Sequence, residues 1–235
     1  MDKSSDRTWE SLGAASGIAA AVLGGVGFGL LASSATFIPV GASQEQIASA
    51  LAAPAAPRVF AGEFLQSLAQ LLLLVFAARL WLTLRRAEGA PGWLSAAAFG
   101  AALLMIAAGA GAVASEYAIA LGAGHGLDVQ GAGALHFLNM AFYVSIWGSS
   151  ALFSGAIAVV GLRGRALPRW LGWSAAAIAI ANLAGLAVPT ADLAQLPPLF
   201  FRLWLLAVGI ALLRRAGGPR PSVESVPVPQ PSRAS

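Results

Sequence analysis

Three polar side chains share one face of a long apolar stretch of the sequence. Glu63, Gln66 and Gln70 lie near the first end of residues 58–84, RVFAGEFLQSLAQLLLLVFAARLWLTL. On a helix of about 3.6 residues per turn, their spacing places them within an arc of about 60°. A carboxyl group and two amides on such a face can bind a small solute or bond to other helices. Polar groups inside a membrane-spanning helix face protein or water rather than lipid, so this face implies further helices around it.

The composition is that of a membrane protein. Hydrophobic residues make up 58% of the chain and charged residues only 10%, whereas soluble domains have about 25% charged residues. The formal net charge of +4 comes from arginines that separate apolar runs, without a continuous basic patch. We therefore expect no nucleic-acid binding. The absence of cysteine excludes disulfides and thiolate chemistry.

Six apolar runs are long enough to cross a bilayer, which takes about 20 residues. The sequence therefore predicts an all-α, polytopic membrane protein with six transmembrane helices at residues 11–34, 58–84, 93–118, 134–162, 170–188 and 193–213. The first run exceeds the roughly 7–15 apolar residues of a signal peptide, so we interpret it as an uncleaved span. Residues 43–54 favour a short interfacial helix capped by Ser43.

The basic residues predict the orientation. Twelve of them lie at the termini and around the loops after spans two and four, and only Arg58 and Arg202 lie at the opposite side. Because basic residues concentrate in the cytoplasm, both termini are expected there. The predicted organisation is a cytoplasmic N-terminus at residues 1–10, a transmembrane domain at residues 11–215 and a disordered tail at residues 216–235.

This topology gathers polar residues of five spans in the outer half of the membrane. The candidate site comprises Glu63, Gln66, Gln70, Glu116, His136, Asn139, Asn182 and Arg202. A charged side chain at a helix centre costs about 2.5–3.5 kcal/mol on insertion scales. Such residues therefore pair with each other or line a wet cavity. We expect Glu63 to pair with Arg202, with Glu116 pairing with Arg202 or His136 as the competing arrangement.

Three interpretations of this cluster stay open. It is a polar network that holds the helices together, a cavity open to the outside that binds or passes a small solute or protons, or an outward-facing active site. Transport or binding of a small solute is the leading specific function. A structural or regulatory interaction protein without transport is the alternative.

The sequence contains few residues suited to catalysis. Its two histidines show neither the His-x-x-x-His nor the Glu-x-x-His spacing of a helical metal site. No serine lies in a Gly-x-Ser-x-Gly elbow, and no phosphate-binding loop of the Walker type is present. We therefore predict no enzyme activity, no catalytic residues, no cofactor and no metal.

Small residues recur every four positions in the first span, at Gly13, Gly17, Ala21, Gly25 and Gly29. Such a ridge lets another helix approach closely. We interpret it as packing within the chain. A homo-oligomer formed through Gly13, Gly17, Gly25 and Gly29 is the alternative use of the same face.

The second half of the chain resembles a bacterial family of six-span membrane proteins described only as a domain of unknown function. The resemblance rests on LRGRALPRWLGWSAAAIAIANLAGLA and LPPLFFRLWLLAVGIALLRR, and above all on the basic Pro-Arg-Trp-Leu-Gly-Trp turn. Glu63, in AGEFLQSLAQ, is similar to a carboxylate commonly placed in that family's second span. The resemblance extends over about residues 12–215. It implies a six-span fold and a place in the bacterial inner membrane, and it implies no substrate.

Overall fold

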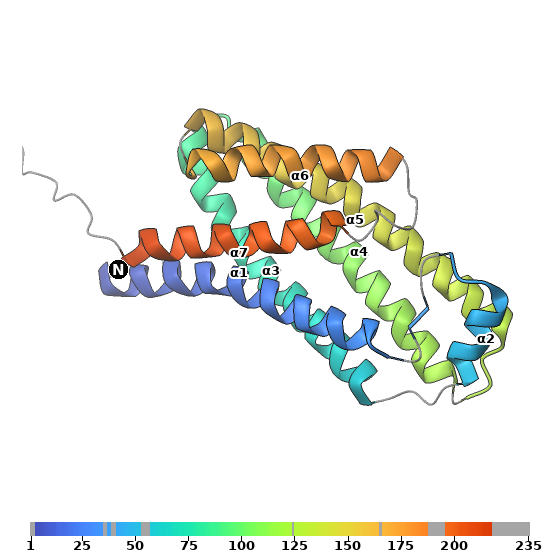
Figure 1. The fold of residues 1–235 in the computed structure, drawn as a ribbon. Coiled ribbons are helices and arrows are strands. Elements are labelled where there is room, and N and C mark those ends of the chain that lie inside the picture. The colour runs from blue at the N-terminus through green and yellow to red at the C-terminus, as the bar shows by residue number, and fades with distance from the viewer. Residues whose placement is uncertain are drawn as a thin grey trace, which may run out of the picture.

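The computed structural model describes residues 3–34, 37–38, 41–52, 57–123, 125–164, 166–187 and 196–217. Over these ranges the chain forms seven helices and no strand (Figure 1): α1 (Lys3–Ala32), α2 (Gln44–Ala52), α3 (Pro57–Glu88), α4 (Trp93–Ala123), α5 (Val129–Gly164), α6 (Arg169–Ala187) and α7 (Leu196–Gly217). The predicted all-α class is confirmed.

Five helices are long and apolar enough to cross a membrane. They are Arg7–Ala32 within α1, together with α3, α4, α5 and α6. The chain is therefore a multi-pass membrane protein by the length and composition of its helices. α7 carries Arg202, Arg214 and Arg215 and is not one of these five helices. The sixth span stays a prediction.

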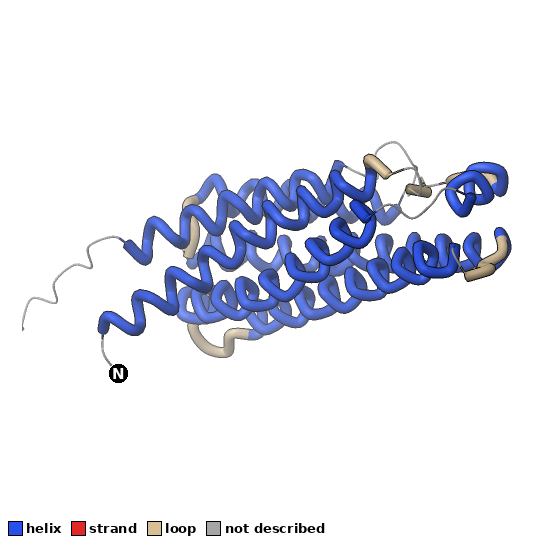
Figure 2. Tube along the Cα trace, turned by 90° about the horizontal axis from the view of Figure 1, so that it is seen from below, coloured by secondary structure: helices blue, strands red, loops and turns tan. Residues whose placement is uncertain are grey.

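The six long helices close into a ring that follows chain order. Each packs against the next, and α7 returns to pack against α1. Figure 2 shows them running broadly along one direction. Contacts are most extensive between α4 and α5 and between α1 and α3, and least extensive between α6 and α7. The ring encloses a space that all six helices can line.

The apolar core fills the arginine-rich half of this ring. Its fully buried side chains include Phe76 and Leu80 of α3, Phe153 and Ile157 of α5, and Val208 of α7. The aromatic rings of Phe153 and Trp204 meet edge to face, with centroids 6.2 Å apart. Lipid tails are as apolar as these side chains, so close packing rather than escape from water holds the helices together here.

The short helix α2 lies at the end of the bundle opposite the N-terminus (Figure 1). The backbone N–H of Gln46 donates to Ser43 Oγ at 3.3 Å, and the backbone N–H of Ser43 donates to Gln46 Oε1 at 2.8 Å. This reciprocal pair is a capping box. The short helix predicted after Ser43 is confirmed, and it packs against α4 and α5.

Several helices extend beyond their predicted ends. α1 begins at Lys3 rather than at residue 11, and most of segment 118–133, between the third and fourth predicted spans, is helical. Asp128 starts α5 early, since its Oδ1 accepts the backbone N–H of Gly131 at 2.7 Å. The predicted tail lies outside the described residues from residue 218 on.

The glycine ridge of α1 is divided between two environments. A Cβ atom on Gly17 would lie 2.3 Å from Phe76 Cδ2, and one on Gly13 would lie 2.8 Å from Arg79. These two glycines therefore pack against α3 of the same chain and are closed to a second copy. Cβ atoms on Gly25 and Gly29 would meet nothing within 4 Å.

Candidate functional site

A cavity of about 150 Å³ lies inside the ring and is lined by residues of all six long helices. A single water needs about 10–15 Å³ on a comparable measure, so the space can hold a small solute. Six of the eight predicted site residues line it: Glu63, Gln66, Gln70, Glu116, Asn182 and Arg202. We call this space the central cavity.

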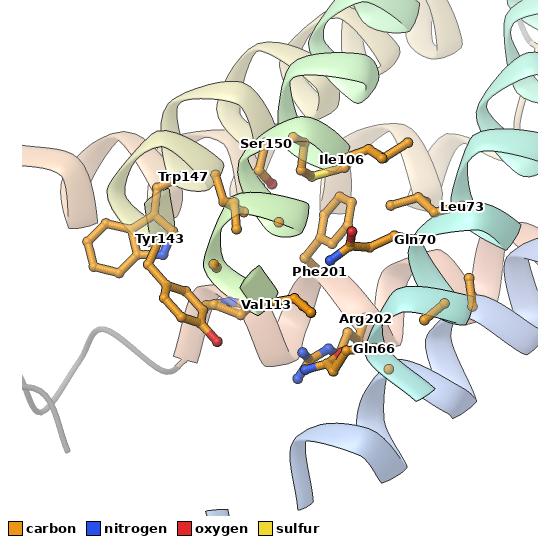
Figure 3. Close-up of a pocket in the computed structure, with 18 of the residues that line it drawn as sticks. Gln66, Gln70, Leu73, Ile106, Val113, Tyr143, Trp147, Ser150, Phe201 and Arg202 are labelled. Carbon is orange, nitrogen blue, oxygen red and sulfur yellow. The ribbon is translucent and has the colours of Figure 1, made fainter. Parts of the chain in front are cut away.

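The polar face of α3 points into the central cavity, as its spacing predicts. Figure 3 draws Gln66 and Gln70 among the residues that line the pocket. Gln66 and Arg202 both reach Gly24 of α1, since a Cβ atom there would lie 3.5 Å from Gln66 Oε1 and 3.8 Å from Arg202 Nε. Gly109 of α4 makes room for Gln70, since a Cβ atom there would lie 2.8 Å from Gln70 Nε2. The single-face arrangement of Glu63, Gln66 and Gln70 is confirmed.

Glu63 is completely buried, at 0% exposure, and no N–H or hydroxyl donor among the described residues bonds its carboxyl oxygens. The carboxyl group meets the carboxyl group of Glu116 in their place. It lines the central cavity toward the α2 end of the ring. Buried polar groups are nearly always hydrogen-bonded, and buried charges are nearly always paired. Two adjacent buried carboxyl groups that face a cavity are therefore suited to share a proton or to bind a group that enters it.

The predicted ion pair between Glu63 and Arg202 is wrong. Ion pairs within 4.0 Å in the described chain join Glu10 to Arg79 and to Arg86, each at 3.7 Å. The packing explains the difference, because α7 lies against α1. This places the guanidinium of Arg202 over the ring of Phe28, 5.2 Å from its centroid. Glu116 does not pair with Arg202 either.

A second cavity, of about 50 Å³, adjoins the central one at the α2 end. Ala50 and Leu51 of α2 line it, together with His136 and Asn139 of α5. Leu31, Glu63 and Glu116 line both cavities. The eight predicted residues are thus divided between two adjoining spaces, with two carboxyl groups at their common boundary. We call the smaller space the outer vestibule.

Glu116 is held in place by Asn139. The Asn139 side chain donates from Nδ2 to the backbone carbonyl of Ala112 at 2.9 Å and to Glu116 Oε1 at 3.3 Å. Asn139 is almost fully buried. The amide thus connects α5 to α4 and orients the Glu116 carboxyl group at the boundary between the cavities.

Three residues of α5 add polar atoms to the lining of the central cavity, beside Ile146. They are Tyr143, Trp147 and Ser150, and Figure 3 shows the first two close together on one side of the pocket. The Trp147 Nε1 and Ser150 Oγ atoms are buried without a hydrogen-bond partner among the described residues. They continue the helical face of Asn139 at steps of three and four residues, a spacing that the sequence already contained.

Asn182 lines the central cavity but bonds within its own helix, since its Nδ2 donates to the Ile178 carbonyl at 2.9 Å. Among the described residues, no group of three histidine, aspartate or glutamate side chains is arranged to hold a metal ion. Comparison with family models, curated proteins and solved structures finds no match to this chain. The function is therefore argued from the cavity.

Proposed function

We propose that this chain is a six-span protein of a bacterial inner membrane that binds a small polar solute in the central cavity and moves it, or protons, across the membrane. The observation that carries the proposal is the set of buried polar atoms without partners around that cavity. These atoms are Trp147 Nε1 and Ser150 Oγ. The Glu63 carboxyl group lines the same cavity and meets the carboxyl group of Glu116 rather than a donor or a base.

A purely structural network would satisfy its own groups. Buried polar clusters that hold a fold together are fully hydrogen-bonded, because a half-satisfied cluster is less stable than an apolar core. Asn139 behaves in that way and bonds both α4 partners. Trp147 Nε1 and Ser150 Oγ have no partner among the described residues, and both residues line an open space. Glu63 lines it too and meets only a second carboxyl group, that of Glu116. This contrast favours a ligand over the structural alternative.

The two ends of the ring differ, which favours access from one side. The outer vestibule adjoins the central cavity at the α2 end, whereas large apolar side chains such as Phe76, Phe153 and Ile157 fill the arginine-rich end. If the arginines are cytoplasmic, as their distribution predicts, the cavity is closed toward the cytoplasm and approached from outside. Transporters place their sites between helices in this way and open the two ends in turn.

Cysteine accessibility tests the proposal directly, because the chain contains no cysteine. Ser150→Cys places a thiol in the central cavity, and we expect a membrane-impermeant thiol reagent added outside to modify it in intact membranes. Ser154→Cys is the matched control, because Ser154 is fully buried and bonds its own helix at the Ser150 carbonyl. Modification of S150C only after unfolding would contradict the proposal.

A further inference from the structure

We propose that a groove between α6 and α7 binds an anionic phospholipid of the membrane, with an acyl chain in the groove and the phosphate against Arg169 and Arg214. The groove lies on the outside of the ring and has a volume of about 460 Å³, within the range of about 300–1,000 Å³ of ligand pockets. None of its lining residues lines the central cavity, so the site is separate from the proposed solute site. We call it the lateral groove.

The lateral groove forms where the ring is least tightly closed. α6 and α7 run alongside each other (Figure 1), with less extensive contacts than the other neighbours in the ring. On α6 the groove is lined by the small side chains of Ser174, Ala177 and Ala181, at steps of three and four residues. The buried ring of Trp204 joins the two helices, since its Nε1 donates to the Leu171 carbonyl at 3.1 Å. The helices are thus held together with a space left between their outer faces.

The length of the lateral groove matches one leaflet of a bilayer. Trp170 and Ala181 line it on α6 and lie about 16 Å apart at the rise of an α-helix, which is about half of the hydrocarbon core of about 30 Å. Trp170 is exposed, as is typical of a tryptophan at the level of the lipid headgroups. The exposed side chains of Phe200 and Leu203 line the groove on α7. An acyl chain crosses one leaflet, whereas a transmembrane helix of a second copy would cross both.

Basic side chains lie at the end of the lateral groove where α6 begins. Arg169 is the first residue of α6 and is exposed. On α7, the exposed Arg214 lies two turns after Ala207, which lines the groove, so the two share one helix face. Arg215 donates from Nη1 to the Ala166 carbonyl, in the turn before α6. This bond brings the end of α7 against that turn, and Arg169 and Arg214 therefore flank the same end of the groove.

Within the described chain, Arg169 and Arg214 form no ion pair. The ion pairs found there join Glu10 to Arg79 and Arg86, at the contact of α1 with α3. Arginine binds phosphate through paired N–H donors, and basic pockets between transmembrane helices bind anionic lipid headgroups. An apolar groove that ends at two unpaired arginines therefore favours an anionic phospholipid over a neutral one.

The test is native mass spectrometry of the purified full chain. The protein is released from micelles that contain equal amounts of phosphatidylglycerol and phosphatidylcholine with identical acyl chains. We expect one retained phosphatidylglycerol, favoured over phosphatidylcholine by on the order of tenfold, because each basic residue near an anionic lipid favours it by about fivefold. Equal retention of the two lipids, or retention of neither, would overturn the inference.

The arginines are tested by the double variant Arg169→Gln with Arg214→Gln, which should retain the two lipids equally. Arg58→Gln is the matched control, because Arg58 is an exposed arginine at the start of α3, far from the lateral groove. It should leave the preference unchanged. A preference that persists in the double variant would show that other groups hold the headgroup, and the assignment would be wrong.

The groove itself is tested by Ala177→Trp, which fills the space with an indole ring and should lower the retention of phosphatidylglycerol by on the order of tenfold. Ile180→Trp is the matched control, since Ile180 is exposed on the same helix and does not line the groove. Equal retention by both variants would overturn the assignment. A dimer that persists with phosphatidylglycerol and is lost in Ala177→Trp would overturn it in favour of a second copy of the chain.

Discussion

Glu63 and Asn139 show two ways in which this fold treats a buried polar side chain. Asn139 reaches across to α4 and bonds both a backbone carbonyl and a carboxylate. Glu63 is buried as deeply, and within the described part of the chain it meets a second carboxyl group, that of Glu116, in place of a donor or a base. The first arrangement stabilises a helix contact. The second is costly to stability and is typical of a functional group.

At the residue scale, Asn139→Ala should destabilise the protein more than Asn182→Ala. Asn139 connects two helices, whereas Asn182 donates to Ile178 of its own helix. Interhelical hydrogen bonds in membranes contribute about 0.6–2 kcal/mol, so we expect a loss of about that size for Asn139→Ala. Equilibrium unfolding in mixed micelles measures both variants. A larger loss for Asn182→Ala would contradict the assigned roles.

The site was predictable from sequence where helical spacing decides it. The face of Glu63, Gln66 and Gln70 follows from a period of about 3.6 residues, and the structure directs it into a cavity. The pairing of Glu63 with Arg202 was not predictable, because it depends on which helix α7 packs against. Trp147 and Ser150 continued a visible spacing but are common residues in apolar helices.

At the scale of elements, the contact between α1 and α3 depends on glycine. Gly17→Ala would place a Cβ atom 2.3 Å from Phe76, a side chain that is itself completely buried. Overpacking of this kind costs about 1–3 kcal/mol. We expect a lowered midpoint of thermal unfolding for the purified protein in detergent.

Gly25→Ala is the matched comparison on the same helix. Nothing lies within 4 Å of a Cβ atom there, and alanine favours a helix over glycine by up to about 1 kcal/mol. The variant should keep or gain stability. A loss accompanied by a smaller particle in size-exclusion chromatography would instead show that this face joins two copies.

Helix existence was easier to predict than helix ends. Apolar runs predicted every long helix, but the third and fourth predicted spans left residues 118–133 as a connection, and most of it is helical. Glycine tolerates helical geometry, and Asp128 caps α5 far upstream of its apolar run. A cap depends on one local hydrogen bond, and the average hydrophobicity of a stretch of residues does not reveal it.

At the scale of the whole molecule, the arginine distribution predicts opposite sides for two described loops. His125→Cys lies in the turn between α4 and α5, and Ala90→Cys lies in the turn between α3 and α4. We expect an impermeant thiol reagent to modify the first in intact cells and the second only after permeabilisation. The reverse pattern would invert the orientation and make the outer vestibule face the cytoplasm.

The most direct test of the central claim compares the thermal stability of Glu63→Gln with that of the wild-type protein in detergent. The variant keeps the shape of the side chain and cannot ionise. Since Glu63 lies against a second carboxyl group and forms no ion pair among the described residues, the account predicts an unchanged or raised unfolding midpoint. Glu10→Gln is the control and should lower the midpoint, because Glu10 pairs with Arg79 and Arg86.

A large loss of stability in Glu63→Gln would contradict the account. Breaking a buried charge pair by removing one partner typically costs about 3–5 kcal/mol. A loss of that size would mean that Glu63 holds the helices together and is not a ligand-binding group. An unchanged or raised midpoint, with S150C still open to reagent from outside, is the result that the cavity predicts.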